Sequence, residues 1–86
     1  MDPGLHVKQG LNHLNRVLSY ANFVAENGKA TVHLTFEDWH VLADMLFHMD
    51  TPRELLPARI RNFALVEGKD AMLLSTDGCE ITVEIM

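Results

Sequence analysis

Histidine and acidic side chains recur along one stretch of the chain with a spacing that could bind a metal ion. Glu37, His40, Asp44 and His48 are three, four and four residues apart. At about 100° per residue, a helix would place all four within an arc of about 80°. Imidazole and carboxylate groups together suit zinc or another divalent transition metal. The same arc is also where an amphipathic helix meets water, so His40, Asp44 and His48 are weak metal candidates and we predict no cofactor.

The single cysteine and the two serines give little basis for nucleophilic catalysis. Cys79 occupies an inward-facing position of a predicted strand, where a small buried hydrophobic side chain is expected. Neither Ser19 nor Ser75 is followed by the tight glycine turn of a nucleophile elbow. The five glycines are scattered and form no phosphate-binding loop. We therefore expect a protein that is not an enzyme.

Three arginines, Arg53, Arg59 and Arg61, form a small basic cluster that could bind a few phosphates or a carboxylate. The whole chain, these arginines included, has 12 acidic and 7 basic residues, which gives a net charge of −5. That balance argues against nucleic acid and anionic membranes as partners, because both depend on bulk attraction to positive charge. Local salt bridging is the expected role of the cluster.

Hydrophobic periodicity predicts the elements that position these residues. A long amphipathic helix is expected over residues 5–26, ended by Asn27-Gly28, with Gly10 either fraying its first turns or packing closely against another element. Its apolar stripe consists of Val7, Leu11, Leu14, Val17, Leu18, Ala21, Val24 and Ala25.

Alternation with a period of two predicts a half-buried strand over residues 30–36. Thr35 then caps a second helix that runs to about Met49. Its buried stripe is expected to consist of Phe36, Trp39, Leu42, Ala43, Leu46 and Met49. A short helix follows at 52–56, with Thr51 as its cap and Glu54 completing a capping box.

The last third of the chain predicts an antiparallel meander of strands at 60–67, 71–75 and 79–85, with Asp77-Gly78 as a hairpin turn. The element order is therefore α-β-α-(short α)-β-β-β. Helices are expected to pack on a mostly antiparallel sheet, which makes an α+β two-layer domain over residues 1–86.

Composition sets the class of protein. With 86 residues and 48% hydrophobic residues, the chain is globular and long enough for one domain. One cysteine cannot form an internal disulfide. The start of the sequence has no basic and apolar leader pattern, and no apolar run approaches the length of about 20 residues that spans a membrane. We expect a cytoplasmic protein.

The face of the first helix opposite its apolar stripe carries a mixture of polar and aromatic residues. Phe23 lies at the centre of this otherwise wet face, close to Tyr20 and Arg16. Aromatic residues and arginine are enriched at the hot spots of protein interfaces. The alternative is that the sheet or the C-terminal segment buries Phe23. The predicted partner-binding residues are Asn12, Arg16, Ser19, Tyr20 and Phe23.

These observations favour a non-enzymatic protein-binding module, either a homodimer or a small acidic inhibitor or regulator of another protein. By analogy of size and charge alone, it is similar to phage and mobile-element proteins that block host machinery, including anti-CRISPR proteins. The first alternative is a histidine-dependent protein that binds a metal or small ligand. The second is a nucleic-acid-associated regulator built around the arginines.

Overall fold

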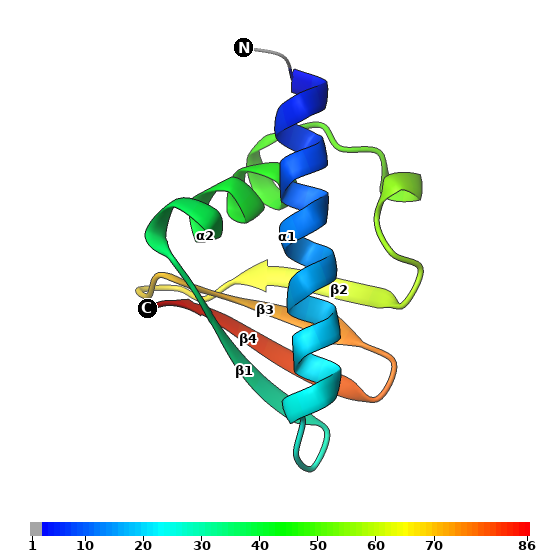
Figure 1. The fold of residues 1–86 in the computed structure, drawn as a ribbon, viewed down its shortest axis with the longest axis vertical. Coiled ribbons are helices and arrows are strands. Elements are labelled where there is room, and N and C mark those ends of the chain that lie inside the picture. Colours follow the sequence, from blue (N-terminus) through cyan, green and yellow to red (C-terminus); the bar gives the residue numbers. More distant parts are fainter. Residues whose placement is uncertain (1–2) are drawn as a thin grey trace.

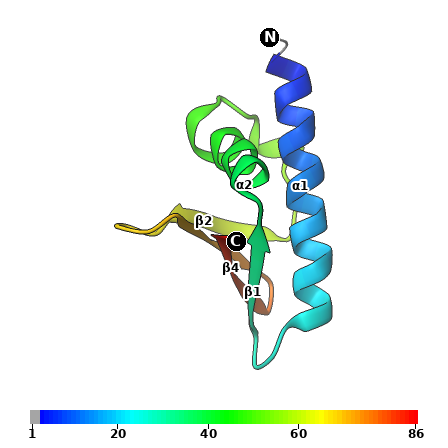
Figure 2. The ribbon, with the colours of Figure 1, turned by 60° about the vertical axis from the view of Figure 1, so that its left-hand side comes forward.

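The computed structural model describes residues 3–86 as two helices packed on a four-stranded mixed sheet, which confirms the predicted α+β class (Figure 1). The long helix α1 runs next to β1 (Figure 2), and the other three strands pair antiparallel with their neighbours β2–β3 and β3–β4. In chain order the elements are α1 (Pro3–Val24), β1 (Lys29–Leu34), α2 (Phe36–Ala43), the π-helix η1 (Asp44–His48), the 3₁₀ turn η2 (Arg53–Leu55), β2 (Ile60–Leu65), β3 (Ala71–Thr76) and β4 (Cys79–Ile85).

The strand order is β1-β4-β3-β2. β2, β3 and β4 form the predicted antiparallel meander, whereas β1 pairs with β4 in parallel. Strands that run parallel need a long connection, and the segment from α2 to β3 supplies it. This topology makes β1 and β2 the two edge strands.

The core lies between the helices and one face of the sheet. Helix α1 buries Leu14, Val17, Leu18 and Ala21 as its periodicity predicts. The inward-facing strand residues that complete the core are Ala30, Val32, Ile60, Met72, Leu74, Ile81 and Val83.

Three contacts hold the helices in place. Gly10 is buried, and a Cβ at that position would lie only 2.6 Å from Cβ of Met45, so α1 approaches η1 more closely than any larger residue permits. The indole Nε1 of Trp39 donates to the main-chain oxygen of Val83 at 2.9 Å, which ties α2 to β4. The hydroxyl of Thr51 donates to the main-chain oxygen of Met45 at 2.9 Å. Of the two interpretations of Gly10, close packing is therefore the right one.

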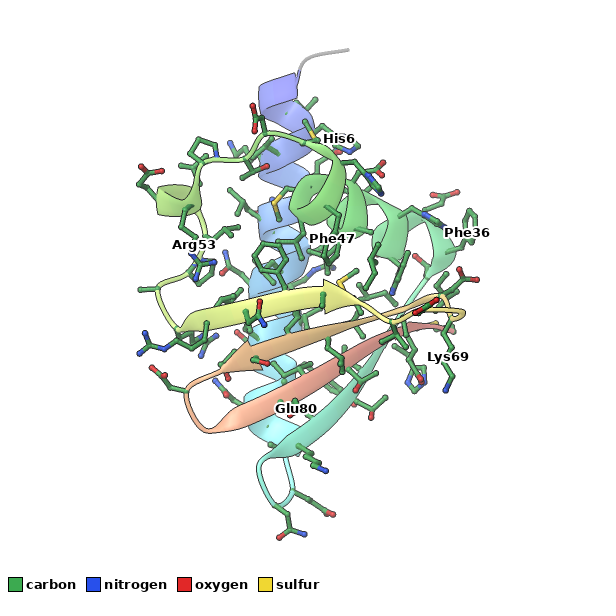
Figure 3. All side chains as sticks on the ribbon, turned by 180° about the vertical axis from the view of Figure 1, so that it is seen from behind. His6, Phe36, Phe47, Arg53, Lys69 and Glu80 are labelled. Carbon is green, nitrogen blue, oxygen red and sulfur yellow. The ribbon has the colours of Figure 1, made fainter. Side chains whose placement is uncertain are left out.

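Three local predictions are wrong. Ala25 belongs to the predicted apolar stripe of the first helix, but α1 ends at Val24 and Ala25 is exposed. The helical stripe places Phe36 inside, but its side chain is 63% exposed and points away from the body of the protein at the start of α2 (Figure 3). The chain leaves the sheet at Leu34 and begins the helix at Phe36, so neither the strand pattern nor the helix pattern controls where this ring points. Thr51 caps no following helix, because its hydroxyl satisfies the end of η1 instead.

Candidate functional site

The predicted partner-binding residues lie together on the outer side of α1. Asn12, Arg16, Ser19, Tyr20 and Phe23, named the helix face, are all exposed. Phe23 is 87% exposed and Tyr20 is 54% exposed. Neither the sheet nor the C-terminal segment covers the Phe23 ring, which decides between the two alternatives that the sequence leaves open.

Arg16 also has partners within its own chain. Its guanidinium bonds Nδ1 of His13 and lies 3.8 Å from a carboxylate oxygen of Asp38. Nε2 of His13 lies 3.5 Å from the other oxygen of Asp38. Asp38 belongs to the first turn of α2, so this cluster connects the two helices and holds Arg16 at one side of the helix face.

A groove of about 450 Å³ runs between α1 and β1. This edge groove connects the helix face to the open side of the sheet, since Arg16 and Tyr20 belong to both. Its lining residues are Arg16, Val17, Tyr20, Thr31, Val32, His33, Leu34, Thr35, Asp38 and Met86. Sequence reasoning missed the contribution of β1, because alternation predicts a strand but not its place at a sheet edge.

The three weak metal candidates have separate surroundings. The His40 ring packs on Phe36 with 4.3 Å between centroids, and Asp44 Oδ2 lies 3.9 Å from Nε2 of His6. His48 is exposed at the end of η1. From Asp44 onward the helix has π geometry, with hydrogen bonds from i to i+5, so the four-residue spacing no longer stacks side chains. Among residues 3–86, no group of three or more metal-ligating side chains comes together.

The arginine cluster is divided between internal partners and solvent. Arg53 donates to the main-chain oxygen of Ile60. Arg61 makes two hydrogen bonds to Asp77, of 2.6 and 2.9 Å, across the β2 and β3 ends. These bonds lower the pKa of Asp77 and raise the pKa of Arg61. Arg59 is exposed.

Two further sequence predictions concern Cys79 and membrane spans. Cys79 is unpaired and half-buried against the core rather than fully buried. Within the described part of the chain, no helix has the length and apolar character needed to cross a bilayer.

Comparison with known proteins gives no family for this chain. No protein-family model, curated protein or solved structure matches it.

Proposed function

We propose that this chain is a non-enzymatic protein-binding module, a small acidic inhibitor or regulator of another protein, and that the helix face is its binding surface. The observation that carries the proposal is the Phe23 ring, 87% exposed at the centre of that face. The proposal includes the phage or mobile-element class suggested by size and charge. It also includes a cytoplasmic location, with which the single unpaired cysteine is compatible.

The exposed rings of Phe23 and Tyr20 can supply binding free energy when a partner covers them. Moving a phenylalanine side chain fully out of water is worth roughly 1.5–3 kcal/mol. Phe23 gains almost none of this within its own chain, and Tyr20 gains about half. Binding to a partner that has a pocket for Phe23 would release this burial free energy. Tyr20, one turn away, and Arg16, about two turns away, are residue types that recur beside such anchors.

The net charge of this chain suggests which charges should surround the pocket on the partner protein. The protein carries a net charge of −5, while Arg16 is the one charged residue of the helix face. A partner with a basic rim around an apolar pocket would be attracted at long range and would still meet little opposing charge at the contact itself. The association rate should then fall as salt is added, with the dissociation rate nearly constant.

The test compares two substitutions of exposed phenylalanines. Phe23→Asp should abolish capture of the partner from a native lysate, whereas Phe36→Asp, an equal change on a different element, should leave the captured partner unchanged. Circular dichroism of both variants checks that they fold. Equal capture by wild type and Phe23→Asp would rule out the helix face as the binding surface.

A further inference from the structure

We propose that the open edge of β1 pairs antiparallel with β1 of a second copy of this chain, joining two four-stranded sheets into one. The occupant of the edge groove is then the second copy. This inference goes beyond the proposed function, because it concerns the strand edge and does not depend on a pocket for Phe23.

The backbone of β1 shows which groups are free. Gly28 and Leu34 each accept a hydrogen bond of 2.8 Å from β4 or the residue after it. Alternate residues of a strand direct their N–H and C=O groups to the same side, so Ala30 and Val32 also face β4. Thr31 and His33 therefore direct theirs into the edge groove.

Lys29 directs its main-chain N–H and C=O to the same side of the strand as Thr31 and His33, but both groups already have a partner. Its N–H and C=O bond the C=O and N–H of Glu26 at 3.0 and 2.9 Å. Beyond His33, the strand ends at Leu34 and the chain turns into α2. The free edge thus consists of two residues, which together offer two donors and two acceptors.

One register uses all four groups. A two-fold axis through Val32 places Thr31 opposite His33 of the second copy, and His33 opposite its Thr31, which gives four backbone hydrogen bonds. Shifting the axis to Thr31 would pair His33 with the occupied Lys29. Shifting it to His33 would pair Thr31 with Thr35, which caps α2 and lies outside the strand.

Side chains in this register are self-complementary. On the inner side, Val32 stands opposite its own copy and Ala30 stands opposite Leu34, so no polar side chain is brought against the core at the junction. On the outer side, Thr31 lies opposite His33 and Lys29 lies opposite Thr35. No two like charges stand opposite each other, although each chain carries a net charge of −5.

A second copy is also the occupant with the lowest ordering cost. Its β1 is already a strand, so pairing orders no flexible chain, whereas an extended peptide would lose conformational entropy. Tyr20, 54% exposed, and Met86, 79% exposed, line the groove and would be covered by the added strand. Phe23 lies about 60° around the helix from Tyr20 and stays available to another partner.

Solution mass tests the proposal. Sedimentation should give twice the 9.7 kDa chain mass for the wild type. Thr31→Pro should give single chains, because proline removes an outward donor without touching the β4 ladder. Thr31→Val keeps the donor, and Leu65→Pro makes the same change on β2, so both should stay dimeric. A monomeric wild type, or a folded Thr31→Pro dimer, would overturn the proposal.

Cross-linking tests the register separately. Opposite residues of a hydrogen-bonded antiparallel pair have Cα atoms about 5.5 Å apart, within the range for a disulfide. In a Cys79→Ser background, a mixture of Thr31→Cys and His33→Cys chains should form the mixed disulfide upon mild oxidation. Each variant alone should cross-link much more slowly. Faster self-linking of either variant alone would contradict a two-fold axis at Val32.

Discussion

The two edges of the sheet are built differently. β1 is regular from Lys29 to Leu34 and carries no bulge, and the main chain of Thr31 and His33 has no backbone partner among residues 3–86. β2 has a register shift between Ile60 and Asn62, and Oδ1 of Asn62 accepts the Phe63 N–H at 2.9 Å. Its inner side is occupied as well, since Phe63 packs against Phe47 of η1 with 5.4 Å between the ring centroids.

Bulges and side chains that satisfy outward amides are devices by which proteins keep a sheet edge from pairing with another chain. β2 has both devices and β1 has neither. The difference is what the proposed pairing at β1 requires, since β1 lacks both of these devices.

The largest effect on stability is expected at the close contact between Gly10 of α1 and Met45 of η1. This contact positions α1, which forms the helical wall of the edge groove. Gly10→Ala would place a Cβ 2.6 Å from Cβ of Met45, and we expect a destabilisation of about 1–3 kcal/mol despite the better helix propensity of alanine. Chemical denaturation measures it. Asn15→Ala, at an exposed position of the same helix, is the control and should not destabilise. A Gly10→Ala variant as stable as wild type would show that α1 is not held by this approach.

A smaller effect is expected from opening the protected edge. Asn62→Ala removes the acceptor of the Phe63 amide, at a cost of about 0.5–1.5 kcal/mol, and gives β2 an unpaired central donor. Light scattering should then show masses above the dimer as concentration rises, because both edges can pair. Asn62→Asp keeps the acceptor oxygen and should behave as wild type. No change in mass for Asn62→Ala would mean that the bulge alone protects β2.

The smallest effect concerns the ion pair beside β2. Hydrogen bonds from Arg61 lower the pKa of Asp77 in the folded protein, so the carboxylate stabilises the fold above its ordinary pKa. That stabilisation is lost as the pH falls through the lowered value. Asp77→Asn should therefore be slightly less stable than wild type at neutral pH and indistinguishable from it in strong acid.

Thermal unfolding at several pH values measures this difference, and added salt should reduce it, because both side chains are exposed. Asp70→Asn, in the exposed turn between β2 and β3, is the matched control. If the difference between Asp77→Asn and wild type grew toward acid, the ionised Asp77 carboxylate would not be the form that stabilises the fold.

Local patterns in the sequence predict most of the fold. The stripe around Leu14 and Leu18 predicts α1, and alternation predicts β1 and β4. Asp77-Gly78 marks the last hairpin, where Gly78 has φ 87°. Each of these signals lies within a few residues of the structure it specifies. The predicted exposure of the helix face is of the same kind, because the apolar stripe of a regular helix fixes which side meets water.

Relations between distant residues could not be predicted in this way. The parallel pairing of β1 with β4 joins Lys29 to Glu80, and it alone makes β1 an edge. The residues after Thr51 predict that it caps a helix, but its hydroxyl donates a hydrogen bond to the main-chain oxygen of Met45 instead. The edge groove likewise requires α1, β1 and Met86 together. No pattern within one segment contains that information.

The most direct measurement of the difference between the edges is hydrogen exchange of the outward amides at two protein concentrations. Between about 10 and about 500 µM, mass action should increase dimer occupancy, and the Thr31 and His33 amides should exchange more slowly while that of Leu65 stays fast. Unchanged exchange of Thr31 and His33 over this range would contradict pairing at β1.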